Sequence, residues 1–348
     1  MRPPPRWLRR LLIAPAFVAL VALAVVSLPI VVVVAAFISR YVPGKWRILR
    51  IVWYLFLYLA IDALAVVVLF AYWIASGFGL KLRIDFWQDA HYRLFAWVLR
   101  RLVASAKFTF KVALIREGPS PRTMGEARSR SILVLSRHAG PGDSLLLMDG
   151  LANQFGRQPR IVLKEFLQWD PAVDIILNRL PSAFVPATQK GEDLLRTISE
   201  MSATMGKDDA FVIFPEGGNY TVKRHLRSIE KLREMGRPDL AERAESLKNT
   251  LPPRSTGVKT ALASAPQNSD VFFVGHAGLE TFDSFGDIWR GMPMGTEVDV
   301  KIWHVPAEKI PPPDEQETWL FDMWAEIDAW ISERLAQTAE HFDDAEDY

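Results

Sequence analysis

A histidine and an aspartate, His138 and Asp143, are the residues whose types and spacing point most directly to chemistry. Side chains five positions apart on a straight helix would point about 140° away from each other. Here a Gly-Pro-Gly run separates them and breaks a helix. The turn therefore lets the carboxylate bind one imidazole nitrogen, which leaves the other nitrogen to accept a proton from a hydroxyl group.

The segments on either side of this turn predict where it lies. The apolar run 131–135 is typical of a buried strand, and 144–155 has an apolar helical pattern. Ligands of open α/β sheets bind at the carboxyl ends of strands. A structural interpretation also stays open, because an aspartate before a helix is a good N-cap and a histidine at a strand end is often structural.

A second buried strand ends in a polar turn at 211–219, which reads Phe-Val-Ile-Phe-Pro-Glu-Gly-Gly-Asn. A carboxylate and two glycines directly after a strand can bring an acid and backbone N–H groups to a ligand. The candidate residues are Glu216, Gly217 and Gly218. An ordinary turn is the alternative.

Together the two turns resemble the glycerophospholipid acyltransferases, the family of 1-acylglycerol-3-phosphate acyltransferases. That family has a His, four residues and an Asp, followed later by a Phe-Pro-Glu-Gly turn, which match His138–Asp143 and Phe214–Gly217. The Pro-Arg-Ser-Thr-Gly run at 253–257 and the tail at 305–324 are similar to the lysocardiolipin acyltransferase branch. The resemblance covers about residues 130–335.

The resemblance implies a mechanism and a set of substrates. His138, held by Asp143, would deprotonate the free hydroxyl of a lysophospholipid, and that oxygen would attack the thioester of acyl-CoA or an acyl-carrier protein. No cofactor is implied. The chain has no cysteine and no Gly-x-Ser-x-Gly turn, in agreement with transfer without an acyl-enzyme. Glu216, Gly217 and Gly218 would line the acceptor site.

Two positions depart from the family pattern. The family usually continues Thr-Arg after Glu-Gly, and this arginine helps to bind the acceptor phosphate, whereas this chain has Gly218 and Asn219. A basic residue usual in a second motif is replaced after Phe184-Val185. Substitutes are Lys164, Arg179, Lys190, Lys223, Arg224 and Arg254. We favour Arg254, because the residues after it predict a helix whose N-terminus attracts anions. The acceptor is therefore expected to differ from plain lysophosphatidic acid.

Other residues give weaker signals. His276 also follows a strand, but no acid lies five positions beyond it, so it ranks below His138. The remaining histidines have no partner pattern, and we see neither a zinc signature nor a phosphate-binding P-loop, so no metal is expected. The formal net charge of +1 gives no sign of a nucleic-acid partner. Oligomeric state is left open.

The first 80 residues predict a membrane anchor. No charged residue occurs in 11–39, and the run 51–80 contains one, Asp62. Each run exceeds the roughly 20 residues that cross a bilayer. Basic residues lie both before the first run and in the loop 40–50, so the positive-inside rule favours neither orientation. Two spans and a re-entrant hairpin stay open, with the catalytic domain expected on the cytoplasmic face. Asp62 is interpreted as a tolerated polar residue between packed helices.

Residues 81–130 predict an amphipathic connector, and 131–348 a catalytic domain with a C-terminal helix. Strand patterns at 132–136, 160–164, 183–185, 210–214, 271–275 and 298–303 alternate with helical patterns. We therefore expect an α/β fold with a mixed sheet and flanking helices, preceded by two apolar membrane helices. A lipid hydrolase that uses the same His and Asp, and a catalytically inactive lipid-binding relative, are the alternative functions.

Overall fold

The computed structural model describes residues 2–44, 46–119, 130–138, 140, 142–186, 188, 191–279, 286, 289 and 297–346, without the side chains of 339–346. The chain forms two compact units that interleave along the sequence. The first unit contains 1–113, 145–194 and 288–295, and the second contains 114–144, 195–287 and 296–348. The predicted anchor, connector and catalytic domain stay predictions, because they divide the chain by function.

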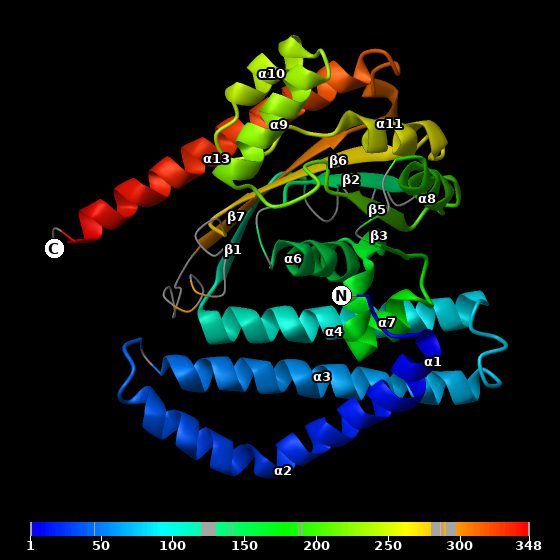
Figure 1. Cartoon of the computed structure of the whole chain (residues 1–348), viewed down its shortest axis with the longest axis vertical. Coiled ribbons are helices and arrows are strands. Elements are labelled where there is room, and N and C mark those ends of the chain that lie inside the picture. Colours follow the sequence, from blue (N-terminus) through cyan, green and yellow to red (C-terminus); the bar gives the residue numbers. More distant parts are fainter. Residues whose placement is uncertain are drawn as a thin grey trace. The chain divides into compact units, whose positions relative to one another are not determined.

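The first unit is built on long helices (Figure 1). Its elements are α1 (Arg6–Leu8), η1 (Arg9–Ile13), α2 (Ala14–Ser39), α3 (Arg47–Ala75), α4 (Asp85–Phe110), η3 (Gly150–Gln154), β3 (Gln158–Lys164), η4 (Glu165–Trp169), α7 (Pro171–Leu177) and β4 (Ala183–Val185). Strands β3 and β4 are parallel. Arg6–Ser39 and Arg47–Ala75 are both long and apolar enough to cross a membrane.

The second unit carries five strands of the mixed sheet, in the order β1-β7-β6-β2-β5. The strands are β1 (Ala113–Glu117), β2 (Ile132–Ser136), β5 (Asp209–Ile213), β6 (Asp270–Ala277) and β7 (Glu297–Val305). Strand β2 is parallel to β5 and β6, whereas β7 is antiparallel to β6. Its helices are α8 (Glu192–Ala203), α9 (Val222–Glu234), α10 (Pro238–Glu245), α11 (Ser255–Ser264), η6 (Ala307–Lys309) and α13 (Gln316–Glu346). Helix α6 (Asp143–Asp149) begins in the second unit and continues in the first.

Continuous burial explains why β2, β5 and β6 are strands. All five residues of β2 and all eight of β6 are buried, as expected for central strands that are covered on both faces. Phe273 of β6 packs edge-on against Trp319 and Trp324 of α13. These aromatic side chains of the C-terminal helix therefore serve in packing. The expected mixed sheet with flanking helices, preceded by two apolar helices, is confirmed.

Two elements differ from the sequence prediction. Helix α3 begins at Arg47, inside the predicted basic loop, because Arg50 donates from Nη1 to the Thr109 carbonyl at 2.7 Å and is satisfied within the helix. Strand β1 was not predicted, since its residues are mostly exposed and have no apolar alternation. Asp62 is buried in α3, as expected for a polar residue between packed helices.

Candidate active site

His138 and Asp143 meet at the carboxyl end of β2. The His138 Nδ1 atom lies 2.8 Å from Asp143 Oδ2. The imidazole is 26% exposed, whereas the carboxylate is 2% exposed. The expectation that the turn brings the two side chains together is confirmed: a partly exposed imidazole is bound to a buried carboxylate.

Asp143 is ionised and firmly held. Its Oδ2 atom accepts a hydrogen bond from the Gly140 N–H at 3.2 Å, and its Oδ1 atom accepts from the Ser144 hydroxyl at 3.1 Å. Burial acts to raise the pKa of Asp143, but the His138 hydrogen bond and the nearby His276 outweigh it and hold the pKa below its usual value. An ionised acceptor favours the tautomer with the proton on Nδ1, so Nε2 of His138 is left to accept a proton.

His276 also faces this carboxylate, which its sequence pattern did not suggest. Its Nε2 atom lies 3.7 Å from Asp143 Oδ2, and its side chain is 6% exposed. The parallel register pairs Ser136 of β2 with Val274 of β6, so the two histidines occur two residues further along neighbouring strands. This contact could be anticipated only from the register of β2 and β6, and that register cannot be assigned until the order of the strands is known.

Glu216 positions the backbone of His138. The carboxylate is buried, and its Oε1 and Oε2 atoms accept hydrogen bonds from the N–H groups of His138 at 3.1 Å and Leu251 at 2.9 Å. Desolvation raises the pKa of Glu216 to about 7, against the lowering effects of these bonds and of Arg137. The phenyl ring of Phe214 lies 4.7 Å from the His138 ring, measured between centroids. A direct contact between Glu216 and substrate stays a prediction.

Arg137 is a further site residue that the sequence analysis missed. Its guanidinium is fully buried and donates to the carbonyl oxygens of His276 and Asn249, the latter at 2.8 Å. Its own N–H donates to the Val274 carbonyl at 3.0 Å. Arg137 thus links the ends of β2 and β6 directly beside His138. A charged residue inside a strand-end motif was the only available signal.

Arg254 lies against the glycine turn. Gly217 has φ +68°, and a methyl group added there would lie 2.9 Å from Arg254 Cζ. The Arg254 N–H donates to the Pro215 carbonyl at 3.0 Å. Helix α11 begins at Ser255, as predicted, but the Ser255 hydroxyl already donates to Glu317 Oε1 at 2.6 Å. The argument from the helix N-terminus is therefore weaker than the contact with Gly217.

Lys164 and Lys190 cannot be joined to this arrangement. Lys164 is exposed at the end of β3, which belongs to the other unit, so its role stays a prediction. Lys190 lies outside the described residues. Among the residues that the structure describes, no group of three or more His, Asp or Glu side chains could hold a metal ion.

A family model described as Acyltransferase matches residues 119–265. This range includes His138, Asp143, the turn at 214–219 and Arg254. No curated protein matches the chain. The match supports acyl transfer as the general activity, and the segment that carries the His–Asp pair and the glycine turn is therefore similar to the acyltransferase family.

Proposed function

We propose that the protein is a membrane-bound O-acyltransferase that moves a fatty acyl chain from a thioester to the hydroxyl of a lysophospholipid. The observation that carries this proposal is the hydrogen bond between His138 Nδ1 and Asp143 Oδ2. An imidazole so held is a general base whose conjugate acid is stabilised by the neighbouring negative charge.

The reaction follows from this pair. Nε2 of His138 takes the proton of the acceptor hydroxyl as its oxygen attacks the thioester carbonyl carbon. The new C–O ester bond forms, the C–S bond breaks, and the proton passes from His138 to the departing thiolate. Asp143 stabilises the imidazolium, and no covalent acyl-enzyme is formed. Glu216 and Arg137 keep His138 in place through the backbone.

The substrates are proposed from the family resemblance. The donor is acyl-CoA or an acyl-carrier protein, and the acceptor is a lysophospholipid such as 1-acylglycerol 3-phosphate or a larger relative, as in the lysocardiolipin branch. Glu216, Gly217 and Gly218 would line the acceptor site. Arg254, whose guanidinium lies against Gly217, would bind the acceptor's anionic group.

The apolar helices are proposed to form an in-plane hairpin rather than two spans. Helix α4 runs antiparallel along the whole of α3. Near the start of α3, Tyr54 packs 4.9 Å from Phe110, and near its end Tyr72 packs 5.5 Å from Trp87, both measured between ring centroids. Because α4 contains six charged residues, Asp85, Asp89, Arg93, Arg100, Arg101 and Lys107, lipid cannot surround α3 along its length.

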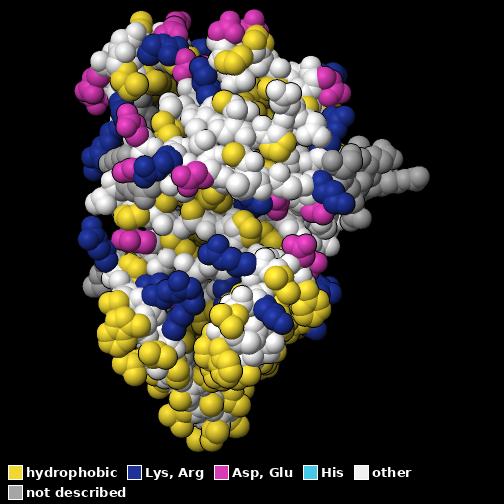
Figure 2. Space-filling model, turned by 90° about the vertical axis from the view of Figure 1, so that its right-hand side faces the viewer, with side chains coloured by type: hydrophobic (Ala, Val, Ile, Leu, Met, Phe, Trp, Pro, Cys, Tyr) yellow, Lys and Arg dark blue, Asp and Glu magenta, His cyan; other side chains and the backbone are white. Residues whose placement is uncertain are grey.

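Helix α2 would then supply the surface that enters the bilayer. Its apolar side chains are exposed, and Figure 2 shows hydrophobic side chains gathered on this surface, with Lys and Arg side chains along the border. They include Leu20, Leu23, Val26, Ile30, Val33 and Phe37. A hairpin of this kind places the basic residues before α2 and those after it on one face, in agreement with a cytoplasmic catalytic domain.

The chain's lack of cysteine makes this arrangement testable by labelling. Single substitutions Pro43→Cys, between α2 and α3, and Thr338→Cys, on exposed α13, should react with a membrane-impermeant thiol reagent from the same side. Labelling from opposite sides would contradict the hairpin and favour two spans.

One assay tests the activity itself. Membranes are incubated with labelled acyl-CoA and a panel of lysophospholipids, with His138→Ala and a matched His304→Ala. His304 is paired with Asp270 at 3.0 Å, at the opposite end of β6, so it controls for loss of a His–Asp pair. Acylation should be lost only in His138→Ala. Equal acylation by both variants would refute the mechanism, and release of free fatty acid alone would identify a hydrolase.

A further inference from the structure

Two arginines flank the pair of glycines that follow Glu216. Arg254 contacts Gly217, as described above. A methyl group added at the next residue, Gly218, would lie 3.3 Å from Nη1 of Arg224. The backbone at Gly218 is two residues from Glu216, whose carboxylate binds the His138 N–H. Both guanidinium groups therefore adjoin the segment that positions the proposed base.

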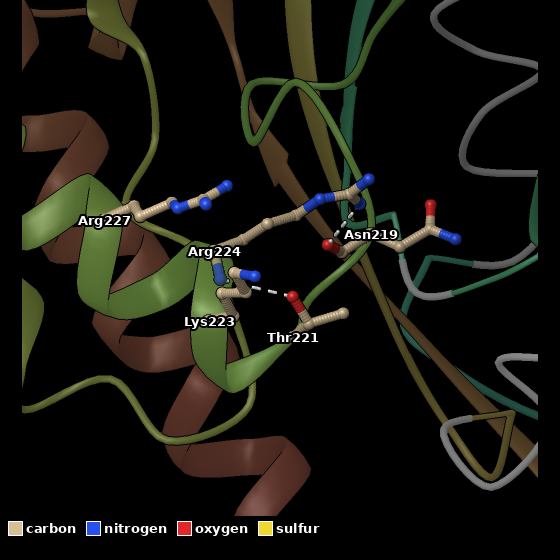
Figure 3. A pocket seen from close by; sticks show the side chains of 5 residues that line it. All are labelled: Asn219, Thr221, Lys223, Arg224 and Arg227. Atoms are coloured by element: carbon tan, nitrogen blue, oxygen red, sulfur yellow. Dashed lines mark hydrogen bonds between the residues drawn. The ribbon is translucent and has the colours of Figure 1, made fainter.

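A cavity of about 430 Å³ opens beside Arg224. Five described residues line it, and none of them is acidic: Asn219, Thr221, Lys223, Arg224 and Arg227. Figure 3 shows the three basic side chains, which all come from the first two turns of α9. Three positive charges around one cavity, with a hydroxyl and an amide beside them, fit a multiply charged anion such as a phosphate ester.

Hydrogen bonds hold the residues that line this cavity. The Thr221 hydroxyl accepts the Arg224 N–H at 3.2 Å and caps α9. Arg224 Nη1 donates to the Asn219 carbonyl at 3.0 Å, which folds the guanidinium back over the glycine turn. The opposite face of α9 is buried at His225 and Ile229. The outer face is thereby fixed, and the guanidinium has five N–H donors, of which this bond uses one.

We infer that Arg224, with Lys223 and Arg227, forms a binding site for a phosphate group of a substrate beside the His138–Asp143 pair. This inference rests on the proposed function. In the family pattern, an arginine of the turn helps to bind the acceptor phosphate. The inference assigns phosphate binding to Arg224 on the following helix, α9, instead. Arg254 would then contact the same turn at Gly217.

The phosphate could belong to either substrate, so the experiment has two arms. The acceptor arm compares KM for 1-acylglycerol 3-phosphate with KM for 1-acylglycerol. The donor arm compares KM for acyl-CoA with KM for the acyl-pantetheine thioester, which has no phosphate. In Arg224→Gln, the preference for the phosphate-bearing compound should fall about tenfold in one arm, which corresponds to ~1.4 kcal/mol. That arm identifies the source.

Controls separate charge from folding. Lys309→Gln removes an exposed positive charge in η6, away from the cavity lining, and should leave both preferences unchanged. Arg224→Lys keeps the charge and should restore most of the lost preference, even if Arg224→Gln also weakens the turn. If Arg224→Gln keeps both preferences, or if Arg224→Lys fails to restore a lost one, the inference is wrong.

A binding measurement keeps this inference separate from the proposed function. Equilibrium dialysis of the full-length protein in detergent uses glycerol 3-phosphate and adenosine 3′,5′-bisphosphate as probes. Binding of one probe that weakens about tenfold in Arg224→Gln supports the site, even for a protein that transfers no acyl group. Absence of Arg224-dependent binding for both probes would refute it, even for an active enzyme.

Discussion

Replacement of Asp143 by Asn tests how the carboxylate acts on His138, the proposed general base. In the wild type, Oδ2 binds His138 Nδ1 and the Gly140 N–H, while Oδ1 binds the N–H and hydroxyl of Ser144. An asparagine has only one acceptor oxygen, so its NH2 group must face one of these two sets. If it faces His138, the imidazole changes tautomer and Nε2 carries the proton. If it faces Ser144, the tautomer is kept but the negative charge is lost.

Both orientations remove the charge that stabilises the imidazolium. Two unit charges about 4 Å apart interact by ~4 kcal/mol at an effective dielectric constant of about 20. This corresponds to a loss of about 10³-fold in kcat. An aspartate that served only as a helix cap would instead cost about 1 kcal/mol of stability and leave kcat nearly unchanged.

The assay is acyl transfer at neutral pH, with thermal unfolding as the control for folding. In a His138→Ala background, Asp143→Asn should cost less than about threefold, because the two residues act as a unit. A loss that multiplies fully in the double variant would refute the assignment of Asp143 to His138. So would a single variant that keeps wild-type kcat.

Three further predictions concern stability. The pKa of Glu216 is raised to about 7 from 4.5, so the stability that this group contributes is complete below pH 4.5 and is lost as the pH rises through 7. The free energy of unfolding of the wild type should fall by about 3 kcal/mol across this pH window relative to that of Glu216→Gln, as measured by denaturation at several pH values. If the two proteins showed the same dependence of this free energy on pH, the prediction would be contradicted. Asp174→Asn leaves Arg9, its partner at 2.8 Å, buried without a counter-charge. This substitution should lower the free energy of unfolding by about 3–5 kcal/mol and speed trypsin cleavage near Arg9. Unchanged cleavage would argue against the Arg9–Asp174 pair as the contact that holds the N-terminal segment. Gly217→Ala should lower the melting temperature more than Gly236→Ala. Both glycines have positive φ, but of the two only Gly217 lies against a side chain, that of Arg254. Equal decreases in the two variants would show that this contact does not limit the residue at position 217.

The strands and the His–Asp turn could be predicted because their signals are local. The apolar runs of β2 and β5 are continuous, and the Gly-Pro-Gly run between His138 and Asp143 leaves few alternatives to a turn. Element boundaries that depend on tertiary contacts could not be predicted from the sequence. Helix α3 extends into a basic segment because Arg50 donates a hydrogen bond to a backbone carbonyl of α4, which is a tertiary contact.

The contact of His276 with the site depends on a pairing between distant segments. His276 reaches Asp143 only because β6 is the neighbour of β2, although more than a hundred residues separate the two strands. Arg224, which the sequence analysis named among the possible substitutes for the missing arginine, makes a local contact instead, because it donates to the carbonyl of nearby Asn219. The pairing of β2 with β6 cannot be read from the local sequence, so the contact of His276 with Asp143 could not be predicted from it.

The course of α4 along α3 bears on how the chain would enter a membrane under the proposed function. With six charges beside the second apolar helix, an in-plane hairpin requires no hydrophilic segment to pass through the bilayer. Entry then needs only partitioning of the α2 surface from one side, which can take place after synthesis is finished. On this basis a translocation channel is unnecessary, and the newly made protein should bind preformed vesicles spontaneously.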